Sequence, residues 1–335
     1  MPERPRLTPP IADTRRAVRE MLPPEGLVLV ALSGGPDSLT LAAATAFEAA
    51  GRAGAVVVDH GLQDASAATA ERAAEQARSL GLAPVRVVRV EVTASGEGPE
   101  ASARAARYEA LDAVAAELGA VAILLGHTLD DQAETVLLGL ARGAGPTSLR
   151  GMGPRTGLYL RPFLGIRRQT TEQACIDAGL EPWHDPQNDD PAYTRVRIRR
   201  NVLPVLEAEL GPGVAVALSR TAEQLREDAD ALDAFAREVA EDIVELEEAG
   251  VSLSVSALVA NPAALRQRLI RLVAASEFHV SLSRAQTLDV ARLVTDWHGQ
   301  KAIDLPGFTA ERRGHRIHLV STTAGTLTGN KPRAD

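Results

Sequence analysis

The feature that most constrains the fold of this chain is an alternation of short apolar runs with helical segments over its first 140 residues. The apolar runs are residues 27–32, 55–58, 85–90 and 121–125, and the helical segments are 39–50, 65–80, 100–118 and a stretch from 129. Short, continuous apolar runs are typical of strands buried on both faces of a sheet. We therefore predict a Rossmann-like α/β fold, an open parallel sheet with helices on both faces, whose ligands bind at the carboxyl ends of the strands.

The pattern changes after about Gly143, and 335 residues are enough for a second domain. Helices at 168–178 and 194–210 flank a proline-rich loop, and a long charged helix follows at 219–246. Strands at 251–255, 301–305 and 316–320, with helices at 263–276 and 284–297, then predict a small α+β unit. We expect an N-terminal helix or extension at 1–24, a catalytic domain at 25–210, a linker helix at 211–248, a C-terminal domain at 249–321 and a disordered tail at 322–335.

Composition excludes several classes of protein. The single cysteine, Cys175, excludes a disulfide framework, a cysteine zinc cluster and paired-thiol chemistry. No apolar run approaches the ~20 residues of a membrane span, and the first ten residues do not make a signal peptide. We expect a cytoplasmic protein with no membrane partner. Aromatic residues are only 3% of the chain, so stacking platforms for bases are scarce.

Charge is distributed unevenly along the chain. The net charge is −8, but all basic residues except Lys301 and Lys331 are arginines. Six arginines and no acidic residue lie between Arg142 and Arg168, and four more follow between Arg195 and Arg200. Because arginine binds phosphate in a bidentate manner, these stretches predict a basic face on an acidic molecule. Scattered, solvated charges are the alternative.

The strongest chemical signal is SGGPDS, residues 33–38, directly after the first apolar run and before the first helix. Its two glycines allow a tight turn, and its free amides and serine hydroxyls are suited to holding a phosphate. The carboxylate of Asp37 would repel phosphate unless a metal ion bridged them, which predicts Mg²⁺. A plain strand–helix turn with Asp37 as a helix cap is the alternative.

Two further segments carry polar residues at strand ends. Asp59 and His60 follow the second apolar run, where they are candidates for adenosine recognition or for a structural turn. His127, Asp130, Asp131 and Glu134 follow the fourth run, at spacings that place them on one face of a helix. Asp131 fits a capping box with Thr128, but three carboxylates and an imidazole are costly to bring together without a cation. We predict a cationic substrate or Mg²⁺ there, in preference to zinc.

The helix from Glu100 to Tyr108, EASARAARY, places Arg104 and Arg107 along one broad side. Taken alone, it is an amphipathic helix with an exposed Glu/Arg pair. The motif SGGPDS resembles the pyrophosphate loop (PP-loop) of the N-type ATP pyrophosphatases, which cleave ATP between the α and β phosphates and adenylate their substrate.

The full series of motifs is similar to that of bacterial tRNA(Ile)-lysidine synthetases. The series is SGGPDS, VDHGLQ, EASARAARY, GHTLDDQAET and DPQN with TRVRIRRNVLP, and it covers residues 25–210. Beyond residue 215 the likeness to the family's tRNA-binding domain is loose. The chain departs from the family pattern at Gln63, Gln187 and Val196, where the family usually has arginine, serine and asparagine.

This resemblance implies a fold like that of the adenine nucleotide alpha hydrolases and a two-step ligation with ATP, Mg²⁺, L-lysine and tRNA(Ile). The wobble cytidine of the CAU anticodon is adenylated with release of pyrophosphate, and the lysine amine then displaces AMP. The implied ATP site is Ser33, Gly34, Gly35, Pro36, Asp37, Ser38, Asp59 and His60, with Asp37 as the metal ligand. The implied catalytic residues are Asp37, Asp130, Asp131 and Arg195. The implied lysine site is His127, Asp130, Asp131, Glu134, Arg104 and Arg107. The implied tRNA contacts are Arg142, Arg150, Arg155, Arg199 and Arg200.

Two other functions remain open on the residues alone. A tRNA thiolase of the same superfamily commonly needs paired cysteines or an iron–sulfur cluster, which the single Cys175 does not provide. A non-catalytic ATP- or RNA-binding module would not need a cluster of acidic groups facing an anion. The sequence leaves the oligomeric state open, with a homodimer as one possibility.

Overall fold

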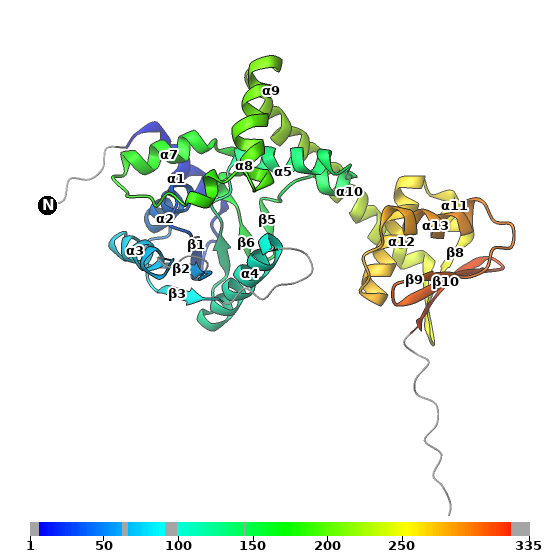
Figure 1. The fold of residues 1–335 in the computed structure, drawn as a ribbon. Coiled ribbons are helices and arrows are strands. Elements are labelled where there is room, and N and C mark those ends of the chain that lie inside the picture. The colour runs from blue at the N-terminus through cyan, green and yellow to red at the C-terminus, as the bar shows by residue number, and fades with distance from the viewer. Residues whose placement is uncertain (1–6, 62–65, 91–98, 144, 323–335) are drawn as a thin grey trace, which may run out of the picture. The chain divides into compact units, whose positions relative to one another are not determined.

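The computed structural model describes residues 7–61, 66–90, 99–143 and 145–322. The predicted disordered tail, apart from Thr322, and Gln63 lie outside the described residues. The chain forms two compact units, residues 1–226 and 227–335. The predicted fold class, a parallel α/β domain followed by a smaller α+β domain, is confirmed by the architecture of these two units (Figure 1).

The first unit is built on a six-stranded sheet. Its strands are β1 (Val28–Leu32), β2 (Ala53–Asp59), β3 (Val85–Arg89), β4 (Ala122–Leu124), β5 (Arg155–Thr156) and β6 (Tyr159–Leu160), in the spatial order β3-β2-β1-β4-β6-β5. All neighbouring strands are parallel except the β5–β6 hairpin. This hairpin was not predicted, because two-residue strands are too short to produce a periodic pattern.

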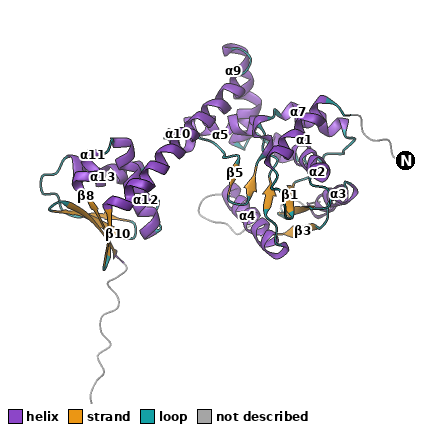
Figure 2. Cartoon of the chain, turned by 180° about the vertical axis from the view of Figure 1, so that it is seen from behind, coloured by secondary structure: helices purple, strands orange, loops and turns teal. Residues whose placement is uncertain are grey.

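Both faces of the sheet are covered, which explains the continuous apolar runs in the sequence. Along β1, residues 28, 30 and 32 face a core shared with helices α1 (Pro9–Met21), α2 (Pro36–Glu48), α3 (Ser66–Ser79) and α7 (Arg168–Asp177). Leu29 and Ala31 face the opposite core, against α4 (Pro99–Leu118) (Figure 2). Every residue of β1 is therefore buried, as the apolar run predicted.

The rest of the first unit is mainly helical. It contains α5 (Leu129–Ala141), α6 (Pro146–Leu149), the 3-10 turns 162–165 and 186–189, α8 (Thr194–Arg197), α9 (Leu203–Leu210) and the start of α10 (Val214–Ile243). The predicted continuous helix 194–210 is interrupted, because a π-helical turn (Ile198–Val202) lies between α8 and α9. Ile198 and Leu203 pack there on Leu129 and Ala133 of α5. Such π-turns occur frequently at functional sites.

The strand order brings the predicted motifs to one edge of the sheet. Strand β1 lies between β2 and β4, so the loops that follow all three strands leave the sheet side by side. Direct packing joins the first and the last of these loops. A Cβ atom placed on Gly126, after β4, would lie 3.3 Å from backbone atoms of Asp37 and Ser38. The absence of a side chain at Gly126 thus permits the two loops to touch.

The second unit has a five-stranded antiparallel sheet in the order β7-β8-β11-β10-β9. Its strands are β7 (Val244–Glu247), β8 (Gly250–Ser254), β9 (Ile303–Leu305), β10 (Phe308–Arg313) and β11 (Arg316–Ser321). Helices α11 (Val255–Ala260), α12 (Ala263–Phe278) and α13 (Arg284–Thr295) lie on one side of it (Figure 2) and share its core, in which Phe308 is fully buried. Strand β7 corrects the predicted helix 219–246, because residues 244–247 pair with β8 in a hairpin.

No single described helix is long and apolar enough to cross a membrane. One bent pair, residues 194–210 with 214–243, meets that criterion by length and composition only.

The contact at Gly126 gives a first prediction. Gly126→Ala should force the Asp37–Ser38 backbone to move by a few tenths of an ångström, because 3.3 Å is tighter than most Cβ contacts. We expect a loss of about 1–3 kcal/mol in the free energy of unfolding, as for other overpacked sites, and a raised KM for ATP. Urea denaturation and pyrophosphate release measure these effects.

Gly165→Ala is the matched control, since a Cβ atom at Gly165 meets nothing within 4 Å. If both variants behave like the parent protein, the two loops do not depend on the close approach at Gly126.

Candidate active site

The PP-loop connects β1 to α2 in a tight turn, in which the amide of Ser33 donates to the hydroxyl of Ser38 at 3.2 Å. Gly34 has a φ of 84°, which favours glycine, and Gly35 is the N-cap of α2 without a capping side chain. The hydroxyl of Ser38 donates to the carbonyl of Gly35 at 3.0 Å and lies 3.1 Å from the hydroxyl of Ser33. A tight turn with hydroxyls and an uncapped helix N-terminus is a binding arrangement for phosphate.

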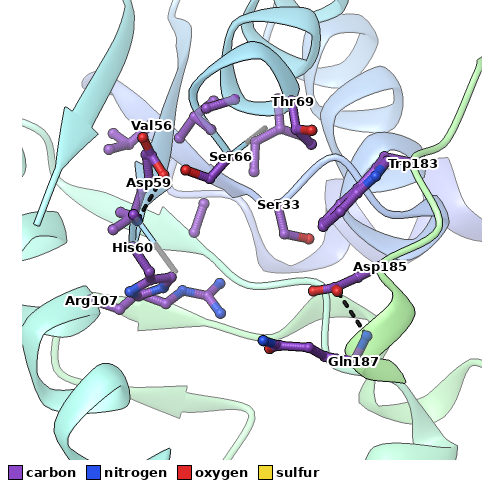
Figure 3. A pocket seen from close by; sticks show the side chains of 16 residues that line it. Ser33, Val56, Asp59, His60, Ser66, Thr69, Arg107, Trp183, Asp185 and Gln187 are labelled. Atoms are coloured by element: carbon purple, nitrogen blue, oxygen red, sulfur yellow. Dashed lines mark hydrogen bonds between the residues drawn. The ribbon is translucent and has the colours of Figure 1, made fainter. Parts of the chain in front are cut away.

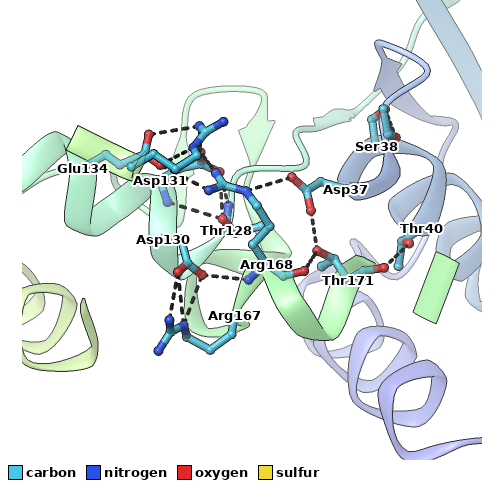
Figure 4. A network of polar contacts seen from close by, with 12 residues as sticks. Asp37, Ser38, Thr40, Thr128, Asp130, Asp131, Glu134, Arg167, Arg168 and Thr171 are labelled. Carbon is cyan, nitrogen blue, oxygen red and sulfur yellow. Dashed lines mark hydrogen bonds and ion pairs between the residues drawn. The ribbon is translucent and has the colours of Figure 1, made fainter. Parts of the chain in front are cut away.

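Asp37 lies in the first turn of α2, where contacts from α7 hold its carboxylate. The hydroxyl of Thr171 donates to Oδ1, and Nε of Arg168 lies 3.6 Å from Oδ2 (Figure 4). Burial raises the pKa of Asp37 to about 6, although the Thr171 hydrogen bond and the Arg168 charge oppose this. Thr40 donates to the Thr171 carbonyl at 2.8 Å, so the contact is anchored on both helices.

The acid-rich helix α5 begins at the end of β4 with the predicted capping box. The Thr128 hydroxyl accepts from the amide of Asp131, whose carboxylate accepts the Thr128 amide at 2.7 Å. Asp131 also forms an ion pair with Arg168. The sequence posed capping and ligand binding as alternatives for Asp131, but its second carboxylate oxygen faces the site while the first caps the helix.

Arginines neutralise the acidic cluster. Arg168 lies 3.2 Å from Glu134, a side chain only 1% exposed, and Arg199 donates to the same carboxylate at 2.7 and 3.1 Å. Asp130 accepts the backbone amide of Arg168 at 2.7 Å and pairs with Arg167 at 3.1 Å (Figure 4). Arg168 is therefore the link between the PP-loop and α5.

His127 lies between these acids and a group of arginines. Burial lowers its pKa to about 4, and the charges of Arg107, Arg161 and Arg104 add to this effect against that of Asp131. Among the described residues, nothing forms a hydrogen bond with the buried Nδ1 atom of His127. The imidazole is therefore neutral at physiological pH and has an unused polar atom.

A cavity of about 160 Å³ lies at the carboxyl ends of β1 and β2 (Figure 3). It contains three residues that sequence analysis assigned to ligands, Asp59, His60 and Arg107, beside Ser33 of the PP-loop. Further lining residues, without an assigned role at the sequence level, are Ser66, Thr69, Trp183, Asp185 and Gln187.

The walls of this cavity are fixed by local contacts. The amide of Gly61 donates to Asp59 at 2.9 Å, and the amide of Gln187 donates to Asp185 at 2.9 Å. Burial and the nearby charge of Arg107 lower the pKa of His60, whose Nδ1 has no hydrogen-bond partner among the described residues. A donor or acceptor on a ligand would satisfy this buried nitrogen.

The arginine-rich stretch 142–168 does not form one continuous basic face. Arg161 is buried and donates to the carbonyl of Gly153 at 2.8 Å, closing the β5–β6 hairpin. Arg167 and Arg168 turn to the acidic cluster, whereas Arg142 and Arg155 are exposed and Arg150 is half-buried.

In the second basic segment, Arg199 points to Glu134, Arg200 pairs with Asp189, and Arg195 is half-buried on α8. Val196, a departure from the family pattern, is buried. The prediction of basic faces considered only arginine–phosphate contacts and missed the internal carboxylates.

Sequence reasoning assigned no role to Thr171 or Trp183, and it placed Arg168 only within a basic stretch. A signal was present for Arg168, since an acid-free stretch followed directly on a cluster of three acids. Nothing in the order of the residues indicated that Trp183 reaches the loop after β1, because about 150 residues separate them.

Comparison with known proteins agrees with this geometry. A family model described as a PP-loop domain matches residues 12–206, and one described as a TilS substrate binding domain matches residues 253–318. The first model and the loop after β1 define the chain as an ATP-using enzyme of the PP-loop class. Its fold is similar to that of a U34-tRNA thiolase from Methanococcus maripaludis, with a TM-score of 0.55 and 20% identity over 65% of this chain and 80% of that one.

Two tRNA(Ile)-lysidine synthases identify the family within this class. The protein from Leifsonia xyli subsp. xyli is 64% identical over 87% of this chain and 89% of its own length. The protein from Thermobifida fusca is 52% identical over 92% and 95%. The chain belongs to the tRNA(Ile)-lysidine synthase family, which confirms the resemblance seen in the sequence and does not favour the thiolase alternative.

The raised pKa of Asp37 predicts that this residue lowers the free energy of unfolding by an amount that depends on pH. The folded protein holds the proton of Asp37 more tightly than the unfolded chain, whose value is 3.8, so this contribution to stability is present below pH 4 and lost as pH rises through about 6. Asp37→Asn should raise the free energy of unfolding at pH 7.5 by at most about 3 kcal/mol and leave it unchanged near pH 4.

Urea denaturation of the two proteins between pH 4 and 8 measures this difference. Equal stability at every pH would mean that the charged form of Asp37 carries no cost in the folded protein.

Arg168 and its neighbour Arg167 form a matched pair for a test of the network. The side chain of Arg168 is 17% exposed among three acids, and that of Arg167 is 44% exposed with one. Arg168→Gln should lower the free energy of unfolding by about 3–5 kcal/mol, because it leaves a buried carboxylate short of a partner. Arg167→Gln should cost at most about 1 kcal/mol. Equal losses in urea denaturation would contradict a special role for Arg168.

Proposed function

We propose that this chain joins L-lysine to the 2-position of the wobble cytidine of tRNA(Ile), with cleavage of ATP to AMP and pyrophosphate. One observation carries the proposal beyond family membership. The phosphate-binding loop after β1 and the acid-rich helix after β4 form a single site, in contact through Gly126 and bridged by Arg168. A nucleotide and an amine bound by these two elements would lie at the same edge of the sheet.

In the first step, the 2-carbonyl oxygen of the cytosine attacks the α-phosphate and pyrophosphate leaves. The amides and hydroxyls of residues 33–38 hold the phosphates, and Ser33 borders the cavity that takes the adenosine. One carboxylate with phosphate oxygens is a sufficient donor set for Mg²⁺, and the part-exposed Asp37 fits that requirement. Bound there, Mg²⁺ would offset the negative charge that develops on the phosphates.

In the second step, the lysine ε-amine attacks the activated 2-position and AMP leaves. An ammonium must lose a proton before it can attack, so the site has to attract a cation and then accept its proton. Asp130, Asp131 and Glu134 supply the negative charge. Arg168 and Arg199 already pair with these acids, so the incoming ammonium shares the carboxylates with the two guanidinium groups. The phosphates of ATP in turn compete with the carboxylates for the guanidinium groups.

The other end of lysine is an α-carboxylate, which requires positive charge or hydrogen-bond donors. His127, Arg104 and Arg107 are the proposed partners, and the mutual influence of these groups on the pKa of His127 supports their proximity. Arg107 also lines the nucleotide cavity, so it borders both substrates.

The proposed tRNA contacts are the exposed arginines Arg142, Arg155 and Arg200. Arg150 and Arg195, which are half-buried, are further proposed contacts. The second unit adds its own basic residues, among them the exposed Arg284 and the half-buried Arg271. Phosphate contacts of this kind make affinity fall steeply with salt. We place the reaction in the cytoplasm, where ATP, lysine and tRNA are all present.

Incubation with ATP, Mg²⁺, labelled lysine and total bacterial tRNA tests the function. We expect label to enter one isoleucine tRNA only when ATP is present. Transfer of sulfur, or the absence of transfer with any amino acid, would exclude this activity.

Asp131→Asn separates the charge of Asp131 from its capping role, because an asparagine oxygen can still accept the Thr128 amide. We expect a KM for lysine raised at least tenfold, with pyrophosphate release close to that of the parent and a lower thermal stability, because the ion pair with Arg168 is lost. An exposed carboxylate on α4, Glu117→Gln, is the control. An unchanged KM for lysine would leave Asp131 with helix capping alone.

A further inference from the structure

The segment from Leu180 to Trp183, which follows α7, is fastened over the PP-loop by three hydrogen bonds. The amide of Trp183 donates to the carbonyl of Gly34 at 2.9 Å. The side-chain amide of Gln76, on α3, donates to the carbonyl of Glu181 at 2.9 Å and accepts its N–H at 3.1 Å. Gln76 thus pairs with the backbone as a neighbouring strand would. These bonds fix the backbone on either side of Pro182.

The side chain of Trp183 stands at the mouth of the nucleotide cavity. It lies across the cavity from Asp59 and His60, on the side of Ser33 (Figure 3). Trp183 also lines an outer groove with Arg72 and Gln76, so its indole separates the cavity from that groove. Trp183 is half-buried, which leaves part of the residue accessible to a ligand.

We propose that Trp183 forms the aromatic wall against the adenine base of ATP and that Gln76 is the residue that positions it. A purine bound beside Ser33 has the aliphatic end of β2, Val56 and Val58, among its neighbours and the indole at the mouth. Base–aromatic stacking is a strong, sequence-independent contact. The chain has two tryptophans, and one of them, Trp183, lines this cavity. Because its amide also donates to Gly34, Trp183 connects the proposed base site to the phosphate-binding loop.

The proposal rests on ATP as the nucleotide of the proposed function and commits to adenine, because Trp183 borders the same cavity as the PP-loop. The alternative partner of Trp183 is the wobble cytosine. Binding of ATP in the absence of tRNA distinguishes the two, because no cytosine is then present.

Indole fluorescence provides a direct test, since Trp297, in the second unit, is the other tryptophan. In a Trp297→Phe background, titration with ATP alone should change the emission of Trp183. Inorganic tripolyphosphate, which has no base, should bind the loop with little change. If ATP binds by filter retention yet leaves the emission unchanged, Trp183 does not contact adenine.

Affinity measurements test the energetic contribution. Trp183→Leu should raise the Kd for ATP at least tenfold and leave that for tripolyphosphate within twofold, while Trp183→Phe should keep most of the affinity. Equal loss for both ligands would mean that the segment supports the PP-loop without contacting the base, and would overturn the proposal.

Gln76→Leu tests positioning, because it removes both hydrogen bonds to Glu181 with a side chain of similar size. We expect the Kd for ATP to rise threefold or more, with a smaller fluorescence change, an unchanged kcat at saturating ATP and unchanged tripolyphosphate binding. Gln173→Leu, on α7, is the control, since the Gln173 amide donates to Asp177, away from the segment 180–183. An unaltered ATP affinity in Gln76→Leu removes Gln76 from the proposal.

These outcomes are independent of lysine transfer. A protein that shows the ATP response of Trp183 but transfers no lysine would contradict the proposed function alone.

Discussion

The ion-pair network of Arg168 is the interaction on which the site depends. A guanidinium that is mostly buried lies between Asp37 of the PP-loop helix and Asp131 and Glu134 of α5, so one positive charge holds two strand-end motifs together. Burying these carboxylates without it would be costly, because unpaired charges are strongly disfavoured in a protein interior. The network makes the proximity of the PP-loop and α5 a property of the fold itself.

The charge of Asp37 conflicts with its burial. Burial raises the pKa of Asp37 to about 6 against the opposing charge of Arg168, so its carboxylate is costlier to ionise in the folded protein than in the unfolded chain. Asp131 avoids this conflict, since its carboxylate accepts the Thr128 amide and also meets Arg168. Helix capping and electrostatic binding are compatible there because a carboxylate has two oxygens, each with its own partner.

The two ligand regions of the first unit differ in chemistry. The cavity at β1 and β2 combines aliphatic walls with Trp183 and a few polar groups, and suits a neutral base. The region at β4 is dominated by paired charges, and suits a zwitterionic amino acid. Arg107 lies between the two regions, because it lines the cavity and its charge, like that of Arg104, acts on His127. This position gives a reason for the two arginines of α4, a helix that looks merely amphipathic in sequence.

The sequence by itself determined the parallel α/β fold, the strands β1 to β4 and the PP-loop, because these depend on local patterns: continuous apolar runs, helix periodicity and a glycine turn. It also determined the family, through the order of its motifs. Only the tertiary structure decided that β1 lies between β2 and β4, that Arg168 and Arg199 turn inward to the acids, and that Trp183 reaches Gly34. These are contacts between residues far apart in the chain, and no local periodicity records the partner of a charge or of an aromatic ring.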